Sequence, residues 1–248
     1  MKIVKIKSTN GITLEADWYQ SKSDKVIIIV HGFTSNRHEW GKYDKASKEF
    51  NEAGYNVINV DMSGSGESDD TPILVKQWEQ DLVACLKMIR KQGYGRVGVF
   101  ASSMGGLTAL RVSAYEEFDA FVGLAPVTSH LKSLKKDNRK QILGIRLIGK
   151  IKREVKDPES SRKHVVVSRK LMKELFTVNQ NKLLEPVKIP SLFLHGTADK
   201  RIPYQESLTA AKLNSNIETK IVTDADHTFT KHTDVFIAES IIWFNKNL

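Results

Sequence analysis

The sequence contains a single cysteine, Cys85, among its 248 residues. One cysteine cannot form a disulfide within the chain or build a cluster of thiolate metal ligands. Cys85 falls in the helical pattern of residues 78–89, so we predict that it packs in the core. No apolar run approaches the roughly 18 residues that a membrane span needs, and residues 1–8 alternate charged and apolar side chains, unlike a signal peptide. We therefore expect a soluble, cytoplasmic protein.

Motifs that bind metals or nucleotides are also missing. The chain has no H-E-x-x-H sequence, and the segment GSGES at 64–68 lacks the spacing of a P-loop or of G-x-G-x-x-G. We interpret that segment as a turn after Asp61. The sequence therefore predicts neither a cofactor nor a metal.

The excess of positive charge is confined to one stretch of the chain. The formal net charge is +9, from 38 basic and 29 acidic residues. Residues 131–156 hold ten of the basic and two of the acidic side chains, which gives +8. The stretch has no aromatic residue to stack on bases, so we expect no nucleic acid partner. A solvated, lysine-rich surface is the simpler interpretation, and weak association with an anionic surface is the alternative. The ten basic residues are Lys132, Lys135, Lys136, Arg139, Lys140, Arg146, Lys150, Lys152, Arg153 and Lys156.

Short apolar runs alternate with amphipathic segments along most of the chain. Residues 2–7 and 12–19 predict an antiparallel pair, because Asn10 and Gly11 are a strong turn signal. The alternation predicts an α/β fold with a mostly parallel, eight-stranded sheet, helices on both faces, and a site at the carboxyl ends of the strands. The other strands are expected at 26–30, 57–60, 97–100, 121–124, 192–194 and 220–222, and helices at 40–53, 72–91, 105–115, 204–213 and 234–245.

One interval, residues 128–185, is too long for a single crossover helix. Its apolar residues have a roughly helical spacing, so we expect a helical cap inserted into a core of residues 1–127 and 186–248. A second cap helix is expected to begin at Ser160 or Ser161 and to end near Phe176.

The segment VGVFASSMGG at 97–106 runs from a buried-strand pattern into a serine with very small neighbours. A serine exposed on a sharp turn between strand and helix needs little bulk two residues before and after it. Ser103 has Ala101 and Gly105 at these places, whereas Ser102 would have Phe100 and Met104. We therefore predict Ser103 as a nucleophile; a helix N-cap is the plain structural alternative.

An acid and a histidine follow Ser103 at the ends of two later strands. Asp199 follows the run at 192–194, and His227 follows the run at 220–222. Serine needs a base near neutral pH, so His227 would take its proton while Asp199 fixes the histidine tautomer. Asp224 and Asp226 compete for the acid's role, but they are neighbours of His227 on one loop, and we favour Asp199.

The turn after the strand at 26–30 is a place for a backbone donor. Phe33 follows the His31-Gly32 turn, and Met104 begins the helix after the nucleophile, so their backbone N–H groups are our candidates for an oxyanion hole. His31 and His195 each precede a glycine at a strand end. For both we expect a structural hydrogen-bonding role rather than catalysis or metal binding.

Five segments together resemble the serine-hydrolase branch of the α/β-hydrolase superfamily. They are HGFTSN at 31–36, DMSGSGESD at 61–69, ASSMGG at 101–106, HGTAD at 195–199 and ADHTF at 225–229. Within that branch the chain is similar to small capped esterases grouped with cinnamoyl and feruloyl esterases, monoacylglycerol lipases and the serine aminopeptidase family. The resemblance implies ester hydrolysis through an acyl-enzyme.

The sequence leaves three functions open. A carboxylesterase that acts on a small ester with a short or medium acyl chain or an aromatic acid is favoured. A lipase or thioesterase whose basic cap recruits anionic lipid, acyl-CoA or acyl carrier protein is the second interpretation. A non-catalytic ligand-binding member of the fold is the third. Dehalogenases and epoxide hydrolases of this fold use an aspartate where this chain has Ser103. Oligomeric state is left open.

Overall fold

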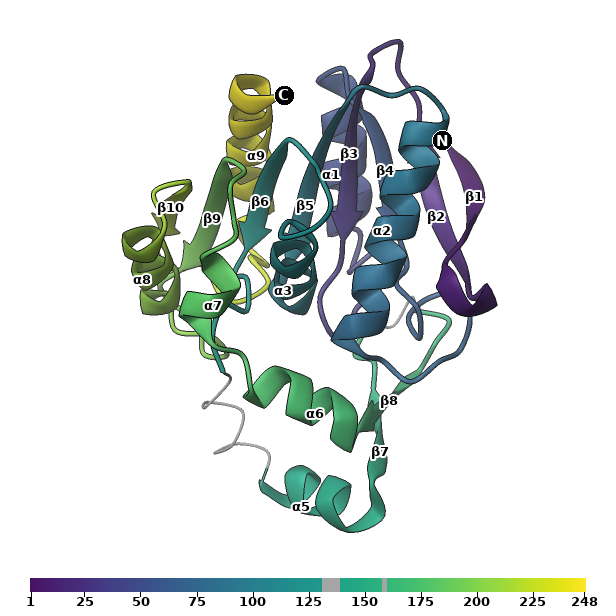
Figure 1. The fold of residues 1–248 in the computed structure, drawn as a ribbon, viewed down its shortest axis with the longest axis vertical. Helices are drawn as coiled ribbons and strands as arrows, with labels where there is room; N and C mark the ends of the chain where they lie inside the picture. The colour runs from purple at the N-terminus through teal and green to yellow at the C-terminus, as the bar shows by residue number, and fades with distance from the viewer. Residues whose placement is uncertain (131–138, 158–159) are drawn as a thin grey trace.

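The computed structural model describes residues 1–130, 139–157 and 160–248 of the chain, drawn in Figure 1. Its centre is an eight-stranded sheet in the order β1-β2-β4-β3-β5-β6-β9-β10. The first strand pairs antiparallel with the second, the second pairs antiparallel with β4, and every other pairing is parallel. The predicted fold class is confirmed. The strands are β1 Lys2–Lys7, β2 Thr13–Tyr19, β3 Lys25–Val30, β4 Asn56–Val60, β5 Arg96–Ser102, β6 Ala120–Leu124, β9 Ser191–Gly196 and β10 Ile217–Val222.

The turn between β1 and β2 has the backbone that its sequence predicts. It is the short 3-10 turn η1, Thr9–Gly11, in which Asn10 has φ 63° and Gly11 has φ 76°. Asparagine and glycine tolerate this left-handed region better than other residues, so the two strands reverse direction here with little strain.

Helices cover both faces of the sheet, and the central strands are buried on both. Alternate residues of β3 enter two separate apolar clusters: Val26, Ile28 and Val30 pack with α2 and α3, whereas Ile27 and Ile29 pack with α1 and α9. This period of two explains why β3 reads as an uninterrupted apolar run. The helices of the core are α1 Lys42–Glu52, α2 Val75–Lys91, α3 Ser103–Val112, α8 Gln205–Leu213 and α9 Thr233–Asn247.

Cys85 is fully buried in α2, as predicted. Burial raises the pKa of its thiol well above the ordinary range, because the thiolate loses its hydration. The side chain therefore acts as a small apolar packing group.

The segment between β6 and β9 is not all helical, and that expectation is wrong in two places. It contains an antiparallel pair, β7 with β8, and α6 begins at Arg169 rather than at residue 160 or 161. Val165 and Val167 are buried, and β-branched residues favour strands. Ser168 caps α6 by accepting a hydrogen bond from the Leu171 N–H. The elements are α5 Arg139–Ile148, β7 Lys150–Glu154, β8 His164–Ser168, α6 Arg169–Phe176 and α7 Gln180–Leu184.

The α5–α6 part of this segment lies beyond the carboxyl ends of the parallel strands (Figure 1). The predicted basic surface includes Lys132, Lys135 and Lys136, which lie outside the described residues.

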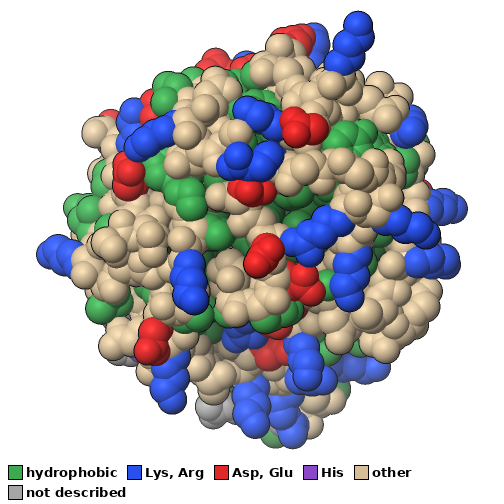
Figure 2. Space-filling view, turned by 45° about the horizontal axis from the view of Figure 1, so that its top comes forward, with side chains coloured by type: hydrophobic (Ala, Val, Ile, Leu, Met, Phe, Trp, Pro, Cys, Tyr) green, Lys and Arg blue, Asp and Glu red, His purple; other side chains and the backbone are tan. Residues whose placement is uncertain are grey.

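On the face shown in Figure 2, basic and acidic side chains are interspersed. None of the helices in the described ranges is long and apolar enough to cross a membrane.

Candidate active site

Ser103 lies at the abrupt junction where β5 ends and α3 begins. Its φ is +50°, a left-handed conformation that is costly for a residue with a Cβ and is typical of functional sites. A Cβ at Gly105 would lie 2.5 Å from the carbonyl oxygen of His31, so only glycine allows α3 to approach the end of β3 this closely. Glycine at position 105 is therefore required by packing.

Ser102 is held by a different partner. Its Oγ accepts a hydrogen bond of 2.7 Å from the Tyr43 hydroxyl, and both residues are buried. Of the two adjacent serines, Ser103 is the one that contacts a histidine.

Ser103, His227 and Asp199 form one chain of hydrogen bonds. The Oγ of Ser103 lies 3.0 Å from Nε2 of His227, and Nδ1 of His227 lies 2.7 Å from Oδ2 of Asp199. An ionised carboxylate only accepts, so the proton of the neutral ring is assigned to Nδ1 and Nε2 accepts from the serine hydroxyl. The structure thus brings together three residues that are far apart in the sequence.

The Asp199 carboxylate is fixed from several sides. Its Oδ1 accepts the backbone N–H groups of Arg201 and Ile202, at 2.7 and 2.9 Å. Burial alone would raise the pKa of Asp199, but hydrogen bonds from His195 and His227 outweigh it and hold the pKa well below its usual range. Asp199 is therefore ionised throughout the neutral range.

His195 contacts the acid, which the sequence did not reveal. Its Nε2 lies 3.1 Å from Oδ2 of Asp199 and 3.0 Å from the carbonyl oxygen of Ile202. Both neighbours are acceptors, so Nε2 carries the proton, and Nδ1 accepts from the Ser207 hydroxyl at 2.8 Å. The expected structural role of His195 holds, with the addition that one of the groups it supports is Asp199. The only signal in the sequence is the spacing of four residues between them.

Asp226 is engaged in its own loop. Its Oδ1 accepts the backbone N–H groups of Thr228 and Thr230, at 3.2 and 2.9 Å. The Nδ1 of His227 is bonded to Asp199 instead. The geometry thus favours Asp199 over Asp226 as the partner of the histidine.

Phe33 and Met104 flank the serine from two elements. A Cβ at Gly32 would lie 3.3 Å from Cβ of Ser103, which places the turn after β3 directly against the serine. Met104 is the second residue of α3, and N–H groups in the first turn of a helix have no partner within it. The two candidate donors therefore belong to two segments that meet at Ser103, the turn after β3 and the start of α3.

His31 is a structural residue, as expected. Its Nδ1–H donates to the carbonyl oxygen of Gly32 at 2.8 Å, and its Nε2 accepts the N–H of Met62 at 3.1 Å. Burial lowers the pKa of His31, so the ring is neutral and ties the turn after β3 to the turn after β4.

A narrow pocket opens at the serine and holds about 20 Å³ of free space. That is room for about one water molecule, so any acyl group larger than this requires side chains around the pocket to move. Its lining comprises Gly32, Phe33, Ser35, Glu39, Tyr43, Ser102, Ser103, Leu124, Arg201, His227 and Thr228.

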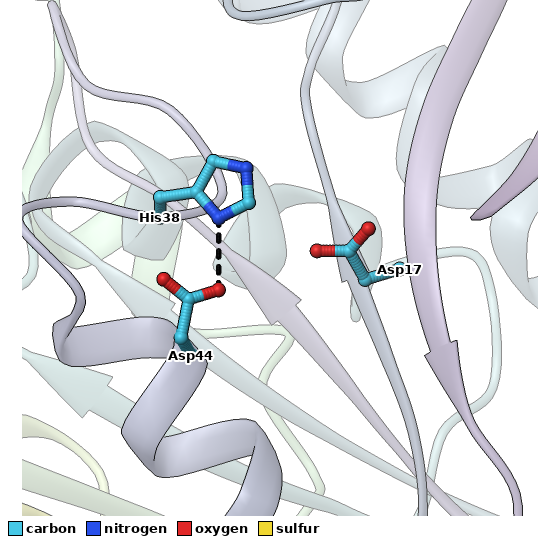
Figure 3. Close-up of side chains that lie close together, drawn as sticks. All are labelled: Asp17, His38 and Asp44. Carbon is cyan, nitrogen blue, oxygen red and sulfur yellow. Dashed lines mark hydrogen bonds and ion pairs between the residues drawn. The ribbon is translucent and has the colours of Figure 1, made fainter. Parts of the chain in front are cut away.

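Asp17, His38 and Asp44 form a separate group whose ligand-type atoms lie within 4.8 Å of one another (Figure 3). Nδ1 of His38 is 2.8 Å from Oδ1 of Asp44, and Nε of the buried Arg37 is 3.3 Å from Oδ2 of Asp17. A cation bound there would compete with Arg37 for Asp17. We interpret the group as an ion-pair network that joins β2, α1 and the loop before α1.

This fold, with Ser103, His227 and Asp199 joined by hydrogen bonds, is typical of hydrolases, and comparison with known proteins identifies the family. Residues 21–234 match the serine aminopeptidase S33 family. The chain belongs to this family of α/β-hydrolases.

The chain is also similar to known hydrolases. The chain is 28% identical over 222 residues to rat (Rattus norvegicus) mitochondrial palmitoyl-protein thioesterase ABHD10, covering 84% of this chain and 68% of the relative. It is 30% identical over 91 residues to a 2-hydroxy-6-oxononadienedioate/2-hydroxy-6-oxononatrienedioate hydrolase of a Pseudomonas species, covering 36% of this chain and only 31% of that enzyme. The structure of Est1E from Butyrivibrio proteoclasticus with ferulic acid superposes with a TM-score of 0.76 at 21% identity, covering 98% of both chains. This likeness concerns the fold.

Proposed function

We propose that this hydrolase is a serine esterase that acts through an acyl-enzyme. The observation that carries the proposal is the continuous hydrogen-bonded chain from the Ser103 hydroxyl through His227 to the ionised Asp199. This arrangement activates a hydroxyl that is otherwise a poor nucleophile. Residues 128–185 are proposed to act as a cap on the core.

The reaction has two halves. In the first, Ser103 Oγ bonds to the ester carbonyl carbon while its proton passes to Nε2 of His227. The negative charge on the former carbonyl oxygen is stabilised by the N–H groups of Phe33 and Met104. The ester C–O bond then breaks, and His227 returns the proton to the departing alcohol.

In the second half, water replaces the alcohol. His227 removes a proton from the water as its oxygen bonds to the acyl carbon, and the bond to Ser103 Oγ breaks. The proton on His227 then restores the serine hydroxyl, and the carboxylic acid leaves. Asp199 stays ionised throughout and stabilises the imidazolium of each half-reaction.

Thioester hydrolysis is the second candidate. The similarity to a palmitoyl-protein thioesterase over 84% of this chain favours it, and the same chemistry would cleave a thioester. Recruitment of anionic lipid or acyl carriers by the basic residues within 131–156 is part of this second proposal. The cytoplasmic location stays a prediction; the rat relative is mitochondrial by its name.

A panel of substrates tests the proposal. It comprises p-nitrophenyl esters from acetate to palmitate, methyl ferulate and an acyl-CoA, with Ser103→Ala as the blank. A fluorophosphonate probe and mass spectrometry of the labelled peptide then identify the nucleophile. Labelling of Ser103 with turnover of an ester supports the proposal, whereas labelling of Ser103 without turnover of any substrate would favour the non-catalytic alternative.

A further inference from the structure

Arg153 belongs to the segment between β6 and β9, and its side chain contacts Phe33 at the candidate active site. It lies on β7, where the exposed residues Lys150, Lys152 and Glu154 alternate with the half-buried Ile151 and Arg153. The side chains of a strand point alternately to its two faces, so Arg153 is on the face turned away from solvent. Its Cζ lies 5.5 Å from the centre of the Phe33 ring. Phe33 in turn lines the pocket at Ser103.

Arg201 approaches the same pocket from the core. It is two residues after Asp199, and its backbone N–H is bonded to the Asp199 carboxylate at 2.7 Å. Arg201 is exposed to solvent and is one of the residues that line the pocket, together with Phe33, Ser103 and His227. Two arginines from distant parts of the sequence thus adjoin one pocket, Arg201 as a lining residue and Arg153 through its contact with Phe33.

The two charges act on each other. Burial lowers the pKa of Arg153, and the positive charge of Arg201 lowers it further. In the described ranges, no carboxylate lies within ion-pair distance of Arg153. Arg153 is half-buried, and a second positive charge near it is unfavourable, so an anion that contacts Arg153 would lower that cost.

We propose that Arg153 and Arg201 bind an anionic group of the substrate, a carboxylate or a phosphate, at the mouth of the Ser103 pocket. A guanidinium presents several N–H donors in one plane and can bind such a group with two parallel hydrogen bonds. The pocket itself holds only about 20 Å³, so the anionic group lies outside it, on the part of the substrate that extends toward β7. The inference rests on the proposed function and adds the charge of its substrate.

Matched substrates test the preference for charge. The p-nitrophenyl ester of monomethyl adipate is neutral, and the p-nitrophenyl ester of hydrogen adipate carries one carboxylate at the same chain length. For phosphate, hexanoyl-CoA is compared with the neutral hexanoyl thioester of N-acetylcysteamine. The Ser103→Ala variant measures spontaneous hydrolysis of each compound.

The measured quantity is the ratio of kcat/KM for the anionic substrate to kcat/KM for its neutral match. We expect a ratio of at least about ten for one of the two pairs, since hydrogen bonds to charged groups are worth more than neutral ones. A high ratio in the adipate pair identifies a carboxylate as the bound group, and a high ratio in the hexanoyl pair identifies a phosphate. Arg153→Gln and Arg201→Gln should each lower that ratio about tenfold, and added salt should lower it in the unmodified protein.

Lys152→Gln is the matched control, because it removes one charge from the same strand on the opposite face. Its ratio should equal that of the unmodified protein. Arg153→Glu should shift the preference toward an ester that carries a trimethylammonium group, which a general loss of folding cannot do. Fluorophosphonate titration of each variant counts the competent sites.

The outcomes separate the two proposals. Turnover of the neutral esters with a ratio near one in both pairs, or an equal fall of the ratio in Lys152→Gln, overturns the anion site and leaves the esterase intact. Failure of every ester and thioester, with no phosphonate label on Ser103, overturns both.

Discussion

Oδ2 of Asp199 accepts hydrogen bonds from two histidines, from Nε2 of His195 at 3.1 Å and from Nδ1 of His227 at 2.7 Å. The bond from His195 fixes the direction of the carboxylate and stabilises its charge. His195 is thus a positioning residue for the proposed reaction, acting through Asp199 on His227.

Replacing His195 with alanine should lower kcat by about tenfold or more and change KM little. The loss of a hydrogen bond to a charged group costs about 1.5–3 kcal/mol, and the affected group orients the base rather than the substrate. His195→Gln places a donor near the former Nε2 and should recover part of kcat. Steady-state kinetics on p-nitrophenyl acetate measure both variants. Equal loss in alanine and glutamine variants of equal thermal stability would contradict the positioning role.

Ser103→Ala should lower turnover by several orders of magnitude, because it removes the nucleophile of a coupled group. Ser102→Ala removes only the acceptor of the Tyr43 hydroxyl. It should therefore retain most of the activity and lose roughly 1 kcal/mol of stability. Esterase assays and urea unfolding of both variants check the prediction. Loss of activity in Ser102→Ala, with activity retained in Ser103→Ala, would show that Ser102 is the nucleophile.

Asp199→Asn should lower kcat about 10⁴-fold, because an amide can hold the ring of His227 in the wrong tautomer. Asp226→Ala should keep kcat within a few-fold, since that carboxylate caps the backbone of its own loop. Its thermal midpoint should fall instead. Parallel kinetics and thermal unfolding test the pair; strong loss of kcat in Asp226→Ala would transfer the acid's role.

The His38–Asp44 pair should make stability depend on pH. The hydrogen bond to Asp44 raises the pKa of His38 above the model-peptide value of 6.5 despite opposing burial. The charged histidine therefore contributes stability that is complete below about pH 6.5 and is lost as the pH rises through the folded pKa. Both side chains are more than one third exposed, so the contribution is small.

Thermal unfolding between about pH 5 and 9 of the unmodified protein and of Asp44→Asn measures this effect. The variant should be less stable at the acid end, and the two curves should approach each other at the alkaline end. Thermal unfolding also tests whether Asp17, His38 and Asp44, drawn in Figure 3, form an ion-pair network. A rise of the midpoint on adding Zn²⁺, lost in Asp44→Asn, would show that these residues bind metal instead.

The sequence predicts the sheet well because its central strands are buried on both faces and interrupted by clear helical patterns. It also predicts the group of Ser103, Asp199 and His227, since each follows an apolar run and parallel strands end at one edge of a sheet. The strands β7 and β8 were not predictable in this way. Their residues alternate over only five positions each, and burial of Val165 and Val167 depends on the core beneath them.

Contacts between loops were also beyond the sequence. His195 and Asp199 are close in sequence, but the direction of each side chain depends on Ser207 and Ile202. Arg153 reaches Phe33 across 120 positions, and no local pattern indicates that meeting. Local periodicity predicts elements, whereas these contacts depend on how the elements are placed.

The left-handed backbone of Ser103 has a consequence for directed evolution of this chain. Glycine adopts a φ of +50° without the roughly 1–2 kcal/mol that a Cβ adds, so it is the residue that stability alone would select at this position. A library of variants sorted only for resistance to heat or protease should therefore accumulate glycine at position 103 and lose hydrolysis. A library sorted for hydrolysis should keep the serine and find its stabilising changes elsewhere in the chain.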